Sequence, residues 1–175
     1  TGLFDEIKKL LTDVGVQVFM MHDIDSNPRL ESVYEGVKVC KDNGIDLVVA
    51  LGGGSTIDCS KVIAAASKTS HDAYEYLWGT ADNIKRKFEN SIDTIVIPTM
   101  ASTGTELNNT AVIMHTASKS KTYCEADCLF PTITIVDPSI AISVPLKLTI
   151  WATMDILSHT FEYYFNGDQS CTFQL

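Results

Sequence analysis

The sequence predicts an α/β fold in which a parallel sheet, covered by helices, precedes the beginning of a helical domain. Short apolar runs such as residues 47–51 alternate with segments of helical period, which is typical of parallel strands buried on both faces. After Val144 and Pro145 the pattern changes to one long, largely apolar helix. With 175 residues, 45% of them apolar, the chain has material for one domain or slightly more.

The first half of the predicted domain consists of three helices and two strands. Apolar residues keep a helical period over residues 3–14, and Gly15 then suits the helix end. Asn27 and Pro28 provide a cap and a first-turn proline for a second helix, which ends at Asn43 and Gly44. Ser55 is expected to cap the third helix, over 55–67. The two strands are expected over residues 16–21 and 47–51.

The second half is predicted from similar local patterns. Residues 72–90 are polar and indicate a surface helix and loop. Residues 94–98 and 132–136 are further strands, the latter stopped by Asp137 and Pro138. Between them, residues 111–114 and 121–124 form a hairpin in this interpretation. The boundaries that follow are 1–143 for the α/β domain and 144–175 for the start of the helical domain.

Charge and cysteine content exclude several classes of function. A net charge of −9 argues against nucleic acid or an anionic membrane as a partner, because both attract Lys and Arg patches. No signal peptide is recognisable, and no apolar run approaches the ~20 residues that span a bilayer. The five cysteines, an odd number without regular spacing, indicate reduced thiols in a cytoplasmic protein. A start without Met indicates a truncated front.

The first candidate site is the glycine triplet Gly52, Gly53 and Gly54, between a predicted strand and a predicted helix. Glycines let the backbone approach a ligand closely, and a helix start offers free N–H groups to a phosphate. Asp58, in the first turn, could cap the helix or meet a ribose hydroxyl. The motif is neither a P-loop nor the dinucleotide fingerprint, since Ile57 takes the third glycine position. Taken alone, it fits a plain tight turn equally well.

The second candidate site is the loop over residues 98–106 (PTMASTGTE), which follows the next strand. Its hydroxyl groups and glycine suit a loop that wraps a phosphate or a ribose, although a solvent-exposed loop has the same composition. Ligands of open parallel sheets gather beyond the carboxyl ends of the strands. Two polar loops at that edge are therefore expected to converge there.

The third candidate is the pair Asp155 and His159, four residues apart on the final helix. This spacing places a carboxylate and an imidazole on one helix face, as metal ligands require. Catalytic metal sites normally take at least three protein ligands, and no histidine follows His159. The pair is therefore either ordinary helix surface or part of a site in a longer enzyme. His22, His71 and His115 are interpreted as structural or solvent-facing.

Taken together and in this order, the motifs resemble the iron-containing (group III) alcohol dehydrogenases, closest to the butanol-dehydrogenase-like branch. The resemblance extends over essentially the whole chain, which therefore looks like an internal fragment of a longer protein. It is carried by LGGGSTIDCSKVIAAA (51–66), IPTMASTGTELNNTAVI (97–113), FPTITIVDP (130–138) and, after Val144 and Pro145, LTIWATMDILSHTFEYYF (148–165). The architecture it implies is a Rossmann-like nucleotide-binding domain, here without its first strand, followed by an all-helical domain, as in dehydroquinate synthase.

The resemblance also implies roles for individual residues. The glycine triplet and Ser55 match the pyrophosphate-binding turn of the family, and Asp58 matches an acid near the nicotinamide. Cofactor contacts are further implied for Thr99, Ser102, Thr103 and Lys121. Asp155 and His159 match the first two of four metal ligands and are thereby the implied catalytic residues; the other two ligands would lie beyond residue 175.

The function implied is the reversible oxidation of a small primary alcohol to an aldehyde, with NAD or NADP and Fe²⁺ or Zn²⁺. A homodimer is compatible with the resemblance. The alternatives are a dehydroquinate-synthase-like or glycerol-dehydrogenase-like member of the same fold, or a non-catalytic nucleotide-binding fragment. The fragment alone is expected to be inactive, because half of the metal site is missing from it.

Overall fold

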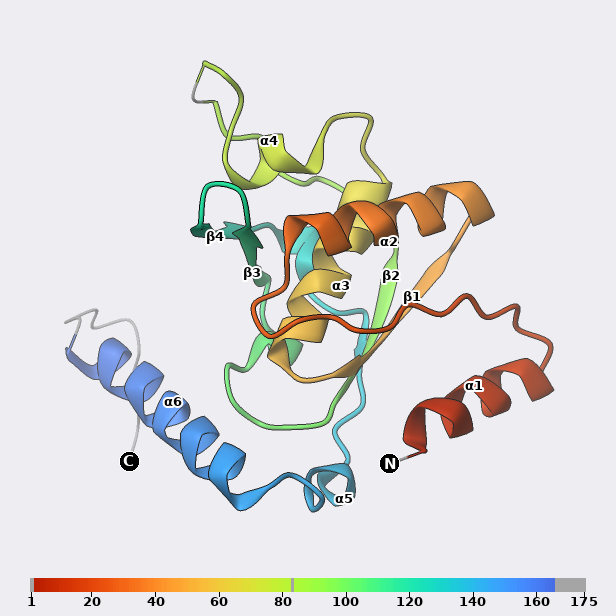
Figure 1. The fold of residues 1–175 in the computed structure, drawn as a ribbon, viewed down its shortest axis with the longest axis vertical. Helices are drawn as coiled ribbons and strands as arrows, with labels where there is room; N and C mark the ends of the chain where they lie inside the picture. The colour runs from red at the N-terminus through yellow and green to blue at the C-terminus, as the bar shows by residue number, and fades with distance from the viewer. Residues whose placement is uncertain (1, 83, 166–175) are drawn as a thin grey trace.

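The computed structural model describes residues 2–82 and 84–165 (Figure 1). The elements are α1 (Leu3–Asp13), α2 (Leu30–Asn43), β1 (Leu47–Gly52), α3 (Gly54–Ser67), α4 (Ala73–Leu77), β2 (Asp93–Pro98), β3 (Thr110–His115), β4 (Ser120–Glu125), β5 (Ile133–Thr134), α5 (Pro138–Ala141) and α6 (Leu146–Phe165), with 3-10 turns η1 (Thr105–Leu107) and η2 (Asp127–Leu129).

The predicted parallel sheet is confirmed. Its strands lie in the order β1-β2-β5, and β1 and β2 pair in parallel along their full length, from Leu47 opposite Asp93 to Gly52 opposite Pro98. β5 is shorter than the strand predicted over 132–136, because regular pairing with β2 is limited to two residues. β3 and β4 form the predicted hairpin as a separate antiparallel sheet.

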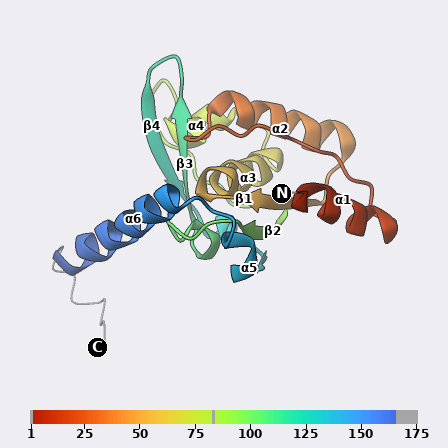
Figure 2. The ribbon, with the colours of Figure 1, turned by 60° about the horizontal axis from the view of Figure 1, so that its bottom comes forward.

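The core forms around α3. This helix packs on β1, β2 and β3, and α2 packs on its outer side (Figure 2). Small residues allow this close approach: Ala64, Ala65 and Ala66 are buried, and a Cβ atom added at Gly36 of α2 would lie 2.3 Å from Ile63 Cδ1. Among the described helices, α3 packs most extensively on the sheet.

Two helix starts differ from the sequence prediction. α2 begins at Leu30 with Arg29 as its N-cap, not at Asn27 and Pro28. Asn27 has a φ of 66°, a left-handed conformation that turns the chain before the helix. α3 has Gly53 as its N-cap, and the predicted cap Ser55 lies inside the first turn. Its hydroxyl oxygen instead accepts a hydrogen bond from the N–H of Asn27.

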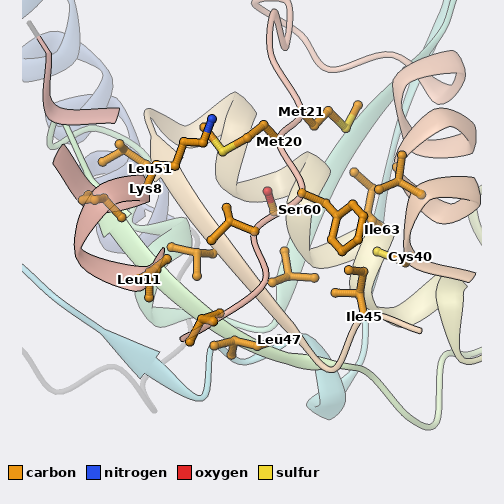
Figure 3. A pocket seen from close by; sticks show the side chains of 18 of the residues that line it. Lys8, Leu11, Met20, Met21, Cys40, Ile45, Leu47, Leu51, Ser60 and Ile63 are labelled. Carbon is orange, nitrogen blue, oxygen red and sulfur yellow. The ribbon is translucent and has the colours of Figure 1, made fainter. Parts of the chain in front are cut away.

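The predicted strand over residues 16–21 is not formed. These residues have no regular secondary structure and pair with no strand in the described part of the chain. They lie instead along a cavity of about 250 Å³ that α1, β1, α2 and α3 also line (Figure 3). The lining is mostly apolar and includes Leu11, Met20, Leu47 and Ile63. A strand needs a neighbour for its backbone groups, and β1 lies across the cavity rather than at pairing distance.

Residues 72–90 are only partly a surface segment. The predicted helix is α4, capped by Asp72, whose carboxylate accepts a hydrogen bond from the N–H of Tyr74. However, Tyr76, Leu77 and Phe88 are buried, and the rings of Tyr76 and Phe88 stack with centroids 4.3 Å apart. The apolar side chains in this polar stretch therefore belong to the core.

The cysteines of the described residues are consistent with the predicted reduced state. Cys40, Cys59, Cys124 and Cys128 are free thiols, and burial raises the pKa of both Cys59 and Cys124 to about 12. Cys171 lies outside the described residues. Among the helices that the structure describes, none has the length and apolar character needed to cross a bilayer. The cytoplasmic location stays a prediction.

Candidate functional site

The two loops singled out in the sequence begin next to each other. β1 ends at Gly52 and β2 at Pro98, and these two residues are paired in the sheet. Just beyond, the N–H of Thr99 donates to the carbonyl oxygen of Gly52 at 3.0 Å. The carboxyl ends of the strands thus bring the glycine turn and the loop after β2 to one edge of the sheet, as predicted.

The glycine turn presents unshielded backbone at the start of α3. Gly53 is the N-cap residue, and no side chain caps the helix. The amides of the first turn have no partner within a helix, and the helix dipole makes this end electropositive. A Cβ atom added at Gly53 would have no protein atom within 4 Å, so the space beside this residue is open. The turn can therefore accept an anionic group at its backbone.

Gly54 is the point at which the two loops touch. A Cβ atom added here would lie 2.9 Å from Oγ1 of Thr103, which is too close for an unperturbed contact. Glycine thus lets the loop after β2 approach the first turn of α3. The hydroxyl group of Thr103 thus lies beside the glycine turn. A cofactor contact by this residue stays a prediction.

Asp58 turns away from the glycine turn and into the protein. One carboxylate oxygen accepts a hydrogen bond from the Thr105 hydroxyl at 2.5 Å, and the other accepts one from the N–H of Val112 at 3.0 Å. Burial raises the pKa of this carboxyl, and these two hydrogen bonds and the nearby Lys61 oppose that effect. Because both oxygens have internal partners, Asp58 connects α3 to η1 and β3. A cofactor contact by this residue stays a prediction.

Lys121 reaches the glycine turn through one intermediate residue. Its ammonium group donates a hydrogen bond to Oδ1 of Asn27 at 2.9 Å, and the N–H of Asn27 donates to Oγ of Ser55 at 3.2 Å. β4 and the segment before α2 are therefore joined to the first turn of α3. The ammonium group adds a positive charge to the surroundings of that turn, which favours an anionic ligand.

The pair on α6 meets the loop after β2. The hydroxyl of Ser102 donates a hydrogen bond to Oδ2 of Asp155 at 2.6 Å, across 53 residues of sequence. Oδ1 of the same carboxylate lies 3.7 Å from Nε2 of His159, as expected for residues four apart on one helix face. Glu162 lies on the other side of the imidazole, with Oε2 3.6 Å from Nδ1. A carboxylate and an imidazole thus project beside a predicted cofactor loop.

The donor set on α6 is incomplete as a metal site. Within residues 2–82 and 84–165, no group of three or more His, Cys, Asp or Glu side chains is arranged to hold a metal ion. Asp155 and His159 are partly exposed and provide one oxygen and one nitrogen donor, the types that Fe²⁺ and Zn²⁺ accept. Their chemistry fits such an ion, but further ligands are required.

The other histidines have partners elsewhere. The ring of His22 packs on Phe4, and His71 lies 3.9 Å from a carboxylate oxygen of Glu75. His115 is 2.7 Å from the Ser118 hydroxyl. These contacts agree with the structural or solvent-facing roles predicted for them.

Comparison with known proteins identifies the family of the chain. The family model for iron-containing alcohol dehydrogenases matches residues 1–138. The chain belongs to the iron-containing alcohol dehydrogenase family. It is 34% identical over 174 residues to a probable NADH-dependent butanol dehydrogenase 1 of Bacillus subtilis (strain 168), a match that covers 99% of this chain and 44% of that protein.

Solved structures of other proteins share this fold. NADH-dependent butanol dehydrogenase A of Thermotoga maritima superposes with a TM-score of 0.88 at 31% identity, over 95% of this chain and 40% of that one. Sulfoacetaldehyde reductase of Bifidobacterium kashiwanohense, solved in complex with NAD⁺, has a TM-score of 0.80 at 30% identity over 92% and 42%. The chain therefore spans less than half the length of these relatives.

Two residues that organise this part of the chain were not predicted from the sequence to do so. Asn27 was interpreted as a helix cap, yet it connects Lys121 to Ser55. Lys61 was not singled out, although its ammonium group is buried and donates hydrogen bonds to η1 and the residues after it. A signal for Lys61 was available, because a lysine in an alanine-rich, apolar helix needs buried partners.

The contact between Ser102 and Asp155 leads to a testable prediction. In Ser102→Ala the loop after β2 loses its hydrogen bond to α6, so we expect the unfolding free energy to fall by about 1 kcal/mol and amide exchange around Asp155 to accelerate. Both are measurable by urea denaturation and hydrogen exchange. Ser143→Ala, which removes an exposed hydroxyl bonded within its own turn, is the control. Equal unfolding free energies and equal exchange rates around Asp155 in the two variants would contradict this hydrogen bond.

Proposed function

We propose that the longer protein containing this chain is a metal-dependent, NAD(P)-linked dehydrogenase that reversibly oxidises a small primary alcohol to an aldehyde. The observation that carries the proposal is the hydrogen bond between Ser102 and Asp155. It joins the loop expected to hold the cofactor to the residue pair expected to hold the metal. A hydride donor, a hydride acceptor and a Lewis acid would thus meet in one place.

The residues present fit a dinucleotide. The open backbone at Gly53, the uncapped start of α3 and the hydroxyl of Thr103 together form an anion-binding turn of the kind that holds a pyrophosphate. Thr99 and Ser102 line the adjoining loop. The nicotinamide accepts a hydride from the alcohol carbon when bound. The names of the butanol dehydrogenase relatives include NADH, which supports NAD over NADP for this protein.

The pair on α6 would hold the metal together with ligands from outside the described residues. A bound divalent ion acts as a Lewis acid that lowers the pKa of the alcohol. The role of the protein here is positioning. The Ser102 hydroxyl fixes one oxygen of Asp155, which leaves the other directed toward His159. Because both donor atoms are already held in place, binding of the metal ion costs less conformational entropy. Iron is supported by the family to which the chain belongs.

The remaining architecture of the longer protein is also a proposal. We propose that residues 1–143 belong to a nucleotide-binding domain and residues 144–175 begin a helical one. A further strand would fill the cavity between β1 and residues 16–21, because β1 pairs with β2 on one edge only and the cavity lining is apolar. Such a strand would also supply the partner that residues 16–21 lack.

The strand can be tested by extending the chain at its N-terminus with the residues that precede it in the longer protein. We expect residues 16–21 and the outer edge of β1 to become protected from amide exchange, because a strand between them pairs with both. A matched extension with proline at alternate positions should give no protection. If both extensions leave the exchange pattern unchanged, the cavity is not a strand site.

The metal role of His159 is tested in the full-length protein. In His159→Ala we expect alcohol-dependent NAD(P)H formation to fall by more than ~100-fold, since even residues that only support a metal ligand are worth 10–100-fold. Metal content, measured by atomic absorption, should fall with it. Thr153→Ala, which changes another exposed position of α6, should retain activity. Turnover at the parent rate in His159→Ala would refute the assignment.

The nucleotide role of the glycine turn is tested separately from turnover. Gly53→Ala adds a methyl group to open space, and the backbone (φ −80°) accommodates alanine, so the fold should be retained. We expect the Kd for NAD⁺, measured by calorimetry, to rise at least ~10-fold, because the methyl group keeps a phosphate from the amides. Ser70→Ala, beyond the opposite end of α3, is the control. An unchanged Kd would exclude this turn as the phosphate site.

A further inference from the structure

Among the described residues, Lys61 is the most deeply buried charged side chain that the proposed function does not use. Its relative exposure is 1%, and it lies on α3 among the buried side chains of the core. A lysine is rarely buried to this extent unless its ammonium group is fully paired. The partners of the ammonium group therefore indicate what this residue does.

All partners of Lys61 lie in one short segment. The ammonium group donates to Oγ1 of Thr105 at 3.0 Å, to the carbonyl oxygen of Asn108 at 2.8 Å, to Oδ1 of Asn108 at 3.1 Å and to the carbonyl oxygen of Thr110 at 3.0 Å. These residues span η1 and the start of β3. The segment directly follows the loop that carries Ser102 and Thr103. Lys61 thus fixes the far end of that loop.

Asp58 holds the same segment from one helical turn earlier. It accepts hydrogen bonds from the Thr105 hydroxyl and from the N–H of Val112, while Thr105 itself accepts from Lys61. α3 begins with the glycine turn, so one rigid helix carries both the turn and the two side chains that hold the loop. The distance between the two loops is set at these contacts and at Gly54, where the loops touch.

We propose that Lys61 is a positioning residue for the dinucleotide site: its ammonium group, with Asp58, holds the loop after β2 at the distance from the glycine turn that ligand binding requires. The inference rests on the proposed function for the ligand. The positioning itself concerns only residues of this chain. Lys61 touches no proposed ligand and acts through Thr105, Asn108 and Thr110.

The charge of Lys61 makes its contacts dependent on pH. The ionisable groups near it are Asp58 on its own helix, Glu106 on η1 and Cys124 on β4. Burial lowers the pKa of Lys61 to about 8, against the opposing influence of Asp58, Cys124 and Glu106. An ammonium group has three donors for its four oxygen contacts, and a neutral amine has two. Above pH ~8 the segment over residues 105–110 therefore loses part of its attachment.

The free energy of unfolding changes with pH in the opposite direction to the attachment of residues 105–110. A lysine with a folded-state pKa below its unfolded value penalises folding while it is charged, and the penalty disappears as the pH rises from about 8 toward the unfolded pKa of ~10.4. A lysine with a purely structural role would give the same change in stability, so the readout that distinguishes the two roles is the ligand affinity. A positioning lysine makes the affinity fall above pH ~8, while the unfolding free energy contributed by this residue does not fall.

The experiment compares the wild-type chain with Lys61→Met, which keeps an unbranched apolar side chain of nearly the same length and removes the ammonium group. Protection factors from amide exchange should fall about tenfold at Thr110 and Val112, the size expected for losing a hydrogen bond to a charged group, and stay unchanged in β1 and β2. Ser67→Ala removes a hydroxyl contact at the other end of α3 and is the control. It should leave the protection factors of all these residues unchanged. Unchanged protection at Thr110 and Val112 in Lys61→Met would overturn the proposal.

Titration of NAD⁺ by calorimetry provides the second measurement. We expect the Kd of the wild type to rise between pH 7 and 9.5 with a midpoint near 8, and that of Lys61→Met to be about tenfold higher at pH 7 and independent of pH in this range. A parallel pH dependence in both proteins would overturn the role of Lys61.

The outcomes separate this inference from the proposed function. If the wild type does not bind NAD⁺ but exchange accelerates in Lys61→Met, the nucleotide assignment fails and the positioning of the segment by Lys61 stands. If Lys61→Met does not fold, the inference is tested on the wild type alone. Its amide protection at Thr110 should weaken above pH 8 relative to that in β2. A ratio of the two protection factors that stays constant with pH would refute the inference.

Discussion

The burial of α3 between the parallel strands, the β3–β4 hairpin and α2 sets the positions of both loops of the site. Alanines along the helix, and Gly36 opposite Ile63, let these elements approach closely. Close-packed protein interiors have low compressibility. The start of α3 is therefore fixed relative to the ends of the strands. The glycine turn and the loop after β2 are thus held facing each other by the packing of α3.

Packing alone would leave the loop after β2 free to move, because loops have few apolar contacts. Its two ends are held by polar contacts instead. Ser102 binds Asp155 near the beginning, and Thr105 binds Asp58 and Lys61 at the end. Buried charges of this kind contribute little net stability, since their desolvation offsets their attraction. What they provide is a defined geometry, which the nucleotide site proposed above would require.

Two apolar surfaces of the described chain remain without partners. One is the cavity between β1 and residues 16–21. The other is α6, where large side chains such as Trp151 and Met154 are more than half exposed while Ala152 is buried. Exposed apolar surface of this extent is typical of protein that packs against further protein. The longer protein proposed above would supply chain to cover both surfaces, since the relatives are more than twice as long as this chain.

The sequence by itself determined the elements whose signals are local: the apolar strands β1 and β2, the glycine turn, the hairpin, and the spacing of Asp155 and His159. It could not determine the pairing of residues 16–21, because a strand is completed only by its neighbour. Nor could it show that Asp58 faces Thr105 and Val112. The contacts of Lys61 with residues 105–110, and of Ser102 with α6, were equally out of its reach. These contacts join residues 44 to 54 positions apart. Only the packing of α3 against the sheet and the hairpin decides which of these polar groups meet, since each must find a partner wherever folding buries it.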